Sequence, residues 1–359
     1  MTRRASDPCE ISWFAALCDD DYEQLGVVDS SLQSSWEHCR QIVEQAERSG
    51  FDNILLPSGY GLGIDTVAFA GGMAGCTSRI RLLVAIRCGE MWAPQSARQM
   101  ATLDHMLDGR LTINIISSEM PGEVLDGPAR YRRTGEVMST LRDLLDGRSV
   151  DTRGEYVSVT IDPPRITTSS KRCPPLYFGG LSDEARDVAA RYADVYLMWP
   201  DTMDGVADLI DDMTRRAADH GRELRFGYRA HVVVRETEDE ARRSAQHIVA
   251  ALDDTEGAAI RARSLDSQST GVRRQAELRE SAAADGFVED NLWTGIGRGR
   301  SGCGVAIVGD PRQVAAKIDA YRDLGIDAFI FSGYPHLDEC RRFGEMVLPL
   351  VNHGPLSSS

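Results

Sequence analysis

The chain has no long run of uncharged apolar residues anywhere in its 359 positions. A membrane-spanning helix needs roughly 18 such residues, and the opening stretch MTRRASDPCE lacks the apolar core of a signal peptide. We therefore expect a cytoplasmic protein that does not enter a membrane.

Positive charge is also scarce, with 40 Lys and Arg against 55 Asp and Glu and a formal net charge of −15. Nucleic acids and anionic membranes are bound through basic surfaces, so the balance argues against both as partners. A small anionic ligand would need a local cluster of arginines that works against the overall charge.

Metal-binding patterns are missing too. The eight cysteines form no C-x-x-C pair and no metal-ligand spacing. In a chain this long we interpret them as reduced thiols that mostly pack in the core. The acidic run 19–21 could bind a metal, but adjacent carboxylates point in different directions. A solvated loop is the favoured interpretation, and we expect no metal.

Short apolar runs that alternate with amphipathic segments are abundant. Runs bounded by Gly, Pro or charge are typical of strands buried in a parallel sheet, and helical patterns lie between them. The expected strands are 11–17, 53–57, 80–86, 111–117, 175–180, 194–199, 225–234 and 327–333, and the clearest helices are 35–52, 95–110, 131–147, 182–193 and 310–327. The alternation predicts one α/β domain over residues 1–359, a (β/α)₈ TIM barrel, ahead of an open doubly wound sheet.

Two regions interrupt this alternation. Residues 148–174 are predicted to form an excursion with a short β pair. Residues 254–303, rich in Ala, Ser, Arg and Gly, are predicted to form a mobile lid inserted before the last strand. The motif GIGRGR at 295–300 does not lie between the first strand and helix of a βαβ unit, so we reject a dinucleotide fingerprint.

Candidate site residues follow from the rule that barrel active sites lie at the carboxyl ends of the strands. Arg229 and His231 are two apart and share one face of a strand. A buried arginine needs an anionic partner, which is either a ligand or a structural carboxylate, and a buried histidine is often only a packing residue. Trp199 ends the expected strand 194–199, and Tyr334 and His336 follow the expected strand 327–333, although the last two could simply flank a turn at Pro335.

A phosphate site is predicted where a strand leads through Gly179 and Gly180 to a helix beginning after Ser182. Free backbone N–H groups and the helix dipole favour an anion there. Glycines also end strands for purely steric reasons, so the motif alone leaves both interpretations open.

Six motifs in this order resemble the two-component alkanesulfonate monooxygenases of the bacterial luciferase-like superfamily, over about residues 11–351. They are ARQMATLDHMLDGR (97–110), PPLYFGGLSD (174–183), VYLMW (195–199), RFGYRAHVVVRETEDEA (225–241), NLWTGIGRGRSGCGVAIVGD (291–310) and FSGYPHLDE (331–339). The resemblance implies reduced FMN from a separate NAD(P)H-dependent flavin reductase, with O₂ as co-substrate. It also implies that a flavin peroxide attacks an organosulfonate to release sulfite and an aldehyde, in a homodimer or homotetramer.

The resemblance also implies which residues act. Around the sulfonate and the reactive edge of the flavin it places Trp199, Arg229, His231, Arg300, Tyr334 and His336. Around FMN it places Tyr131, Gly179, Gly180 and Ser182 at the phosphate, with Asn114 and Arg87 near the isoalloxazine. On this basis Arg300 would close over the bound substrate.

One segment departs from the family pattern. After the second strand the family reads PTGRSCED, whereas this chain reads PSGYGLGID at 57–65, with Leu62 or Gly63 where the cysteine would stand. Met91 and Trp92 are also expected to reshape the pocket. The substrate therefore stays open, and a flavin monooxygenase that tailors another sulfur- or nitrogen-containing compound is the alternative. A flavin-binding protein without turnover and a deazaflavin-dependent dehydrogenase are further alternatives.

Overall fold

The barrel predicted from the sequence is confirmed in a computed structural model that describes residues 7–59, 63–120, 122–262, 269–300 and 302–356. In this part of the chain the closed sheet has the order β9-β13-β1-β2-β3-β4-β7-β8, and β8 pairs back with β9. All neighbours in it are parallel, and each strand overlaps one of the eight predicted runs. The strands are β1 (Glu10–Phe14), β2 (Asn53–Leu56), β3 (Arg81–Arg87), β4 (Leu111–Ile116), β7 (Leu176–Phe178), β8 (Val195–Met198), β9 (Arg225–Val234) and β13 (Ile326–Ser332).

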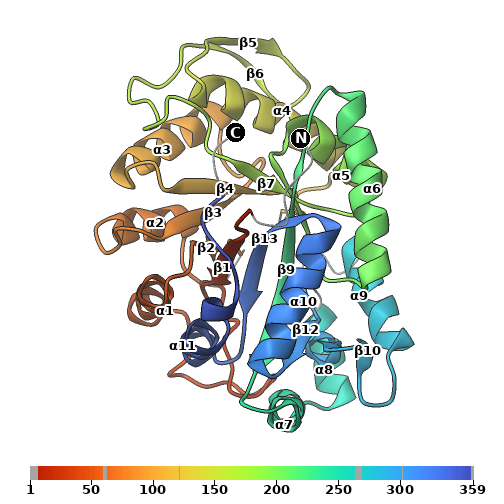
Figure 1. The fold of residues 1–359 in the computed structure, drawn as a ribbon. Helices are drawn as coiled ribbons and strands as arrows, with labels where there is room; N and C mark the ends of the chain where they lie inside the picture. The colour runs from red at the N-terminus through yellow and green to blue at the C-terminus, as the bar shows by residue number, and fades with distance from the viewer. Residues whose placement is uncertain (1–6, 60–62, 121, 263–268, 301, 357–359) are drawn as a thin grey trace.

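Helices surround the barrel on its outer side (Figure 1). They are α1 (Trp36–Ser49), α2 (Thr66–Ala74), α3 (Ala93–Met106), α4 (Gly127–Leu145), α5 (Asp183–Tyr192), α6 (Met203–Asp219), α10 (Pro311–Leu324) and α11 (His336–Met346), followed by the 3₁₀ turn η2 (Leu348–Leu350). Helix α1 is capped at both ends, since Ser35 accepts from His38 N–H and Gly50 ends the helix at a φ of 91°. No helix in the described ranges has both the length and the hydropathy needed to cross a bilayer.

Residues 148–174 and 254–303 contain further elements outside the alternation of barrel strands and helices. The first contains the antiparallel pair β5 (Val150–Arg153) and β6 (Ser158–Ile161). The second, residues 254–303, is largely folded against the barrel, and we call it the insertion. It contains α8 (Asp254–Ala262), α9 (Thr270–Ser281), β10 (Phe287–Glu289), β11 (Leu292–Trp293) and η1 (Gly295–Arg298), lying between α7 (Glu238–Ile248) and β12 (Ala306–Gly309).

The insertion is joined to the barrel through β12, which pairs in parallel with the far half of β9 from His231 to Val234. β11 then pairs with β12, and β10 pairs with β11. The segment GIGR forms the short 3₁₀ helix η1, so it does not open a βαβ unit, in agreement with the rejected fingerprint.

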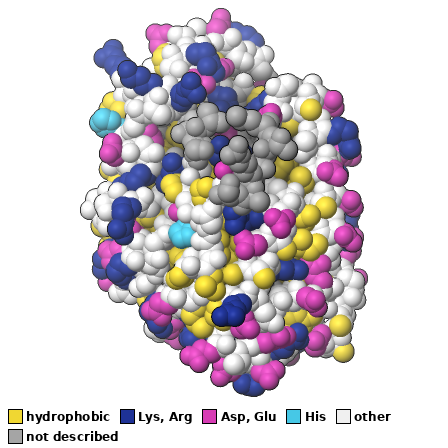
Figure 2. Space-filling view, in the orientation of Figure 1, with side chains coloured by type: hydrophobic (Ala, Val, Ile, Leu, Met, Phe, Trp, Pro, Cys, Tyr) yellow, Lys and Arg dark blue, Asp and Glu magenta, His cyan; other side chains and the backbone are white. Residues whose placement is uncertain are grey.

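Charged side chains of both signs are interspersed on the face shown in Figure 2, with acidic ones prominent along its lower edge. This agrees with the net charge of −15. The core divides into a large layer between strands and helices, a second cluster between α7, the insertion and the far half of β9, and a smaller cluster inside the barrel. The inner cluster contains Phe14, Leu55, Leu83, Tyr177, Val195, Ala328, Ile330 and Leu356.

A polar network closes the amino-terminal end of the barrel. Glu10 is fully buried and accepts hydrogen bonds from Tyr177 Oη (2.7 Å), Asn53 Nδ2 (3.2 Å) and the backbone N–H of Leu356 (3.3 Å). Burial raises the pKa of Glu10, and these donors oppose that rise. The network therefore ties β1, β2, β7 and the last described residues together.

Replacing Tyr177 by Phe should lower the free energy of unfolding by about 1–3 kcal/mol, because it removes one donor from a buried carboxyl group. Urea denaturation followed by circular dichroism measures the loss. Tyr192→Phe on α5 is the matched control and should change stability little. Equal stability of wild type and Tyr177→Phe would show that the network does not hold the barrel end.

Candidate functional site

Arg229 and His231 of β9 are both buried, at 4% and 1% exposure, and share one face as predicted. Ser332 of β13 lies between them, because its Oγ accepts from Arg229 (2.8 Å) and lies 2.9 Å from His231 Nδ1. The guanidinium of Arg229 lies 4.6 Å from the ring centroid of Phe14, a member of the cluster inside the barrel. Both side chains therefore face the barrel interior near its carboxyl end.

Arg229 forms no ion pair with a carboxylate among the residues that the structure describes. Its other hydrogen bonds go to the carbonyl oxygens of Ala230 (2.6 Å) and Ile330 (3.4 Å). Burial lowers its pKa, but an arginine stays protonated at neutral pH. Since a buried cation without a counter-ion is costly, this position can hold an anionic ligand.

Arg300 reaches the same place from the insertion. It donates a hydrogen bond to Tyr334 Oη (2.5 Å) and forms an ion pair with Asp20 Oδ2 (2.9 Å). Its guanidinium lies 5.8 Å from the Phe14 ring centroid, and the Tyr334 ring packs on His231 with centroids 5.1 Å apart. The two predicted arginines thus flank one phenyl ring.

His336, the first residue of α11, completes this group. Its ring stacks on Phe14 (5.5 Å between centroids) and meets Tyr334 edge-on (5.2 Å). Among the described atoms, His336 Nδ1 and His231 Nε2 are buried and have no hydrogen-bond partner. We call Arg229, His231, Arg300, Tyr334 and His336 the Arg229 cluster, and it can offer a ligand two cations and two imidazole nitrogens.

The interpretation of the acidic run 19–21 as a solvated loop is wrong. Asp20 pairs with Arg300, and Asp21 is only 5% exposed. Asp21 accepts from the backbone N–H of His336 (2.9 Å), and its other oxygen lies 2.8 Å from His38 Nε2. The signal that could have found them is position, because the run follows the first barrel strand at the end where active sites lie.

Trp199 lies one residue beyond β8, at the contact between the barrel and the insertion. A Cβ atom on Gly271 of α9 would stand 2.8 Å from its ring, and one on Gly302 would stand 3.4 Å from it. The next residue, Cys303, donates from Sγ to the carbonyl oxygen of Arg229 (3.3 Å). The structure therefore brings Trp199 to the edge of the Arg229 cluster.

Both glycines of the predicted phosphate site lie in close packing. A Cβ on Gly179 would lie 1.9 Å from Leu197 O, so glycine is needed there for strand packing. Gly180 has a φ of 151°, and a Cβ on it would lie 2.7 Å from Ala185 Cβ and 3.5 Å from Tyr131 Oη. Ser182 accepts from the N–H of Ala185 and begins α5. The cradle between Tyr131 and the start of α5 fits a phosphate group.

Acidic residues at the start of α5 qualify this fit. Asp183 and Glu184 are in the first turn, where negative charge opposes an anion. Asp183 is paired with Arg186 (3.3 Å) and Arg216 (2.9 Å), which compensate its charge. Tyr131 and the backbone N–H groups at the start of α5 are thus the uncharged polar groups that border this position.

Arg87 and Asn114 lie on adjacent strands at the same barrel end. Arg87, the last residue of β3, donates to Ser58 O (2.6 Å) after β2 and to Ser118 Oγ after β4. Asn114 is half-buried on β4, in register with Ala85 of β3. Arg87 therefore ties together the loops that border the predicted flavin position.

The divergent segment 57–65 is only partly described, and Leu62 lies outside the described residues. Gly63 has a φ of 89°, and a Cβ on it would stand 1.8 Å from Leu17 O. The N–H of Ile64 donates to the same oxygen (2.8 Å). A cysteine could not replace Gly63 without moving this loop away from the end of β1.

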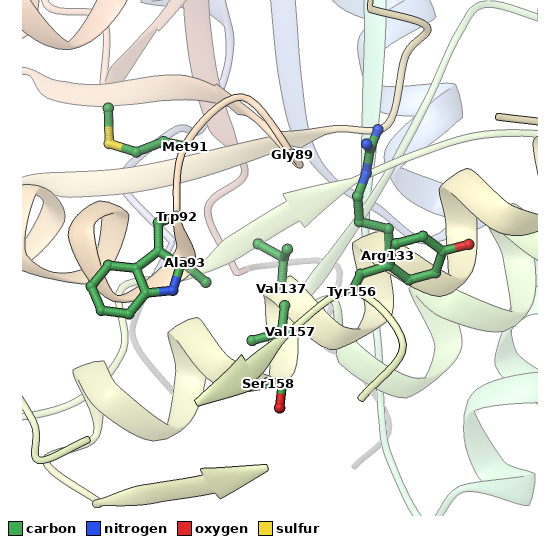
Figure 3. Close-up of a pocket in the computed structure, with 9 residues that line it drawn as sticks. All are labelled: Gly89, Met91, Trp92, Ala93, Arg133, Val137, Tyr156, Val157 and Ser158. Carbon is green, nitrogen blue, oxygen red and sulfur yellow. The ribbon is translucent and has the colours of Figure 1, made fainter. Parts of the chain in front are cut away.

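Met91 and Trp92, which are expected to reshape the substrate pocket, line a cavity of about 410 Å³ between the loop before α3, α4 and the β5–β6 pair (Figure 3). Their role in the substrate pocket stays a prediction. None of the predicted site residues lines it. Its lining residues are Gly89, Met91, Trp92, Ala93, Arg133, Val137, Tyr156, Val157 and Ser158.

Because His231 and His336 are buried, we expect the stability of the protein to depend on pH. Burial, together with Arg229 and Arg300, holds the pKa of His231 well below its usual 6.5, and burial also lowers that of His336. The unfolded chain then binds protons near pH 6.5 that the folded chain does not. The free energy of unfolding should therefore fall below pH 6.5, by up to about 1.4 kcal/mol per pH unit for each histidine.

His231→Gln should reduce this slope, because glutamine does not titrate. Urea denaturation between pH 5 and pH 8 measures it, and the exposed His105→Gln is the control that should keep the wild-type slope. Identical slopes for all three proteins would mean that His231 binds its proton equally well in the folded chain.

Comparison with known proteins shows the family to which the chain belongs. Residues 14–328 match the model of luciferase-like monooxygenases. A sulfoquinovose monooxygenase of Novosphingobium aromaticivorans is 61% identical over 98% of this chain and 99% of its own length. A sulfoquinovose monooxygenase of Agrobacterium fabrum is 53% identical over 97% of this chain and 91% of its own length.

Solved structures share the fold at low sequence identity. A riboflavin lyase aligns with a TM-score of 0.80 and 17% identity, over 98% of this chain and 94% of its own. The EDTA monooxygenase of Chelativorans sp. BNC1 aligns with a TM-score of 0.76 and 17% identity, over 96% and 93%. The family match includes all of β9, which carries Arg229 and His231, and it ends within β13 at Ala328. Because the match covers most of the chain, the chain belongs to the luciferase-like monooxygenase family of flavin-dependent enzymes.

Proposed function

We propose that the protein is a two-component monooxygenase that uses reduced FMN and O₂ to cleave the C–S bond of sulfoquinovose. The products are sulfite and an aldehyde. The name shared by the two relatives supports this sugar sulfonate rather than the simple alkanesulfonate that the sequence resemblance implied. A separate NAD(P)H-dependent flavin reductase would supply the reduced FMN, and the active form would be a homodimer or homotetramer.

The observation that carries the proposal is the buried Arg229, whose charge has no carboxylate partner within the described ranges. A sulfonate supplies that missing negative charge, and its three oxygens can accept from a guanidinium fork. His231 Nε2 and His336 Nδ1, both buried and without a described partner, are available to further oxygens or hydroxyl groups of the substrate. The cluster thus matches an oxyanion on a hydroxylated ring.

FMN would be held with its phosphate between Tyr131, Gly180 and Ser182, and with its ring towards Asn114 and Arg87. When bound, reduced FMN supplies the electrons that activate O₂. The protein residues bind and orient the sulfonate at the open end of the barrel. Arg300, from the insertion, would complete the enclosure with Trp199 and exclude water, with the insertion acting as a mobile lid.

Arg229→Met should lower kcat/KM for sulfite release from sulfoquinovose by about 100-fold or more, because the charged hydrogen bonds to the sulfonate are lost. The assay supplies reduced FMN from a generic flavin reductase and detects free sulfite. Arg229→Lys should retain part of the activity with a raised KM, since the charge remains but the planar fork does not.

The exposed Arg243→Met on α7 is the control for loss of one positive charge and should retain wild-type activity. Anaerobic titration with reduced FMN should give the same affinity for wild type and Arg229→Met. Wild-type protein that binds reduced FMN but releases no sulfite from sulfoquinovose would overturn the proposal.

The proposed phosphate position has its own test. Tyr131→Phe should weaken binding of FMN by about tenfold, the loss of one hydrogen bond to a charged group, and should leave binding of riboflavin unchanged because riboflavin has no phosphate. Gly180→Ala should act in the same direction, because its Cβ would stand 2.7 Å from Ala185 Cβ and displace the start of α5 from Tyr131. Tyr156→Phe, on the β5–β6 pair, is the control. Equal weakening of FMN and riboflavin would place the phosphate elsewhere.

A further inference from the structure

The charged groups of the Arg229 cluster do not balance. Arg229 and Arg300 flank Phe14, with guanidinium carbons 4.6 and 5.8 Å from its ring centroid. Asp20 Oδ2 lies 2.9 Å from Arg300, and no carboxylate of the described residues forms an ion pair with Arg229. Two cations and one carboxylate leave one positive charge in excess.

The neighbouring titratable groups do not alter this count. Asp21 is directed away from the two arginines, towards His38 (2.8 Å) and the backbone N–H of His336 (2.9 Å). Burial and the arginines keep the pKa of His231 well below 6.5, so its ring is neutral at neutral pH. Burial raises the pKa of Tyr334, so its phenol is neutral as well.

We propose that Asp20 is a specificity-determining residue that restricts the site to anions of single negative charge. A sugar sulfonate is then accepted, and a sugar phosphate with the same ring is rejected. The proposal rests on the proposed function, in which the anion of the substrate binds at Arg229. A sulfonate carries one negative charge, whereas a phosphate monoester carries between about 1.5 and 2 at pH 7.

Burial is what makes one unit of charge decisive. Charges interact more strongly in a partly buried site than in water, and an unmatched charge there is costly. A monoanion neutralises the excess cation, whereas a dianion leaves a second negative charge beside Asp20. Asp20 Oδ1 is buried and has no hydrogen-bond partner among the described residues, so Arg300 is the group that compensates its charge.

The discrimination matters because the two ligand classes share a hydroxylated ring and a tetrahedral oxyanion. Hydrogen-bond donors such as those of Arg229, His231 and His336 can serve either anion. Shape and hydrogen bonding therefore discriminate poorly between a sugar sulfonate and a sugar phosphate. The difference in their negative charge discriminates well. Removing the carboxylate would leave both arginines unopposed and would match a dianion.

The test compares dissociation constants of sulfoquinovose and glucose 6-phosphate, measured by isothermal titration calorimetry on the full chain saturated with FMN at pH 8. We expect wild type to prefer the sulfonate. Asp20→Asn should lower the ratio of the phosphate to the sulfonate dissociation constant by about tenfold or more, the effect of one unit charge at close range.

Two matched variants separate charge from structure. Asp19→Asn removes the same charge one residue away, where the carboxylate accepts from the N–H of Ser34, and should keep the wild-type ratio. Asp20→Glu keeps the charge and should also keep the ratio. Asp20→Ser replaces Asp20→Asn if the latter does not fold, as judged by thermal melting.

The outcomes are distinguishable. Two results would overturn the role of Asp20 while the proposed function stands. One is a wild-type ratio of the phosphate to the sulfonate dissociation constant in Asp20→Asn. The other is a ratio in Asp20→Glu that falls as far as it does in Asp20→Asn. Wild-type protein that binds neither ligand overturns both. A ratio that falls only when the charge of Asp20 is removed supports the inference.

Discussion

The site depends on the way strand β9 changes partners along its length. Its first half, up to Tyr228, pairs with β8, and its last half, from His231, pairs with β12. β13 covers the other edge of β9 as far as His231. One edge of β9 therefore changes its partner from β8 to β12 beside Arg229. Arg229 and His231 lie at this change, where the barrel meets the insertion.

This change of partner explains how the buried side chain of Arg229 is held in place. On the side where β8 has ended, the carbonyl of Arg229 accepts from Cys303 Sγ instead of from a ladder partner, and Trp199 has just left the strand. On the other side, Ser332 of β13 fixes both Arg229 and His231. The strand is thus held on both edges, and the side chains of Arg229 and His231 lie where β12 replaces β8 as its partner.

Much of this arrangement could be predicted from sequence. Apolar runs gave all eight barrel strands, and the spacing of two placed Arg229 and His231 on one face. The contact of Arg300 with Tyr334 was implied by the family resemblance alone, because 34 residues separate them. Helix α2 was not singled out, since its sequence TVAFAGGMA contains no charged residue and gives no amphipathic pattern.

Other parts could not be predicted because they depend on tertiary contacts. Asp20 and Asp21 look like a hydrated acidic loop until the insertion and α11 are placed against them. The cavity that Met91 and Trp92 line depends on where the β5–β6 pair folds. A local pattern predicts an element and its buried face, but not which distant side chain meets it.

The pairing of β1 with β13 has a consequence for synthesis. The first barrel strand finds one of its two neighbours in residues 328–330, more than 300 positions later. During translation the edge of β1 therefore stays unpaired until almost the whole polypeptide has left the ribosome. An exposed edge of this kind can pair with other chains, so the nascent protein has a long period in which chaperone protection would be of value.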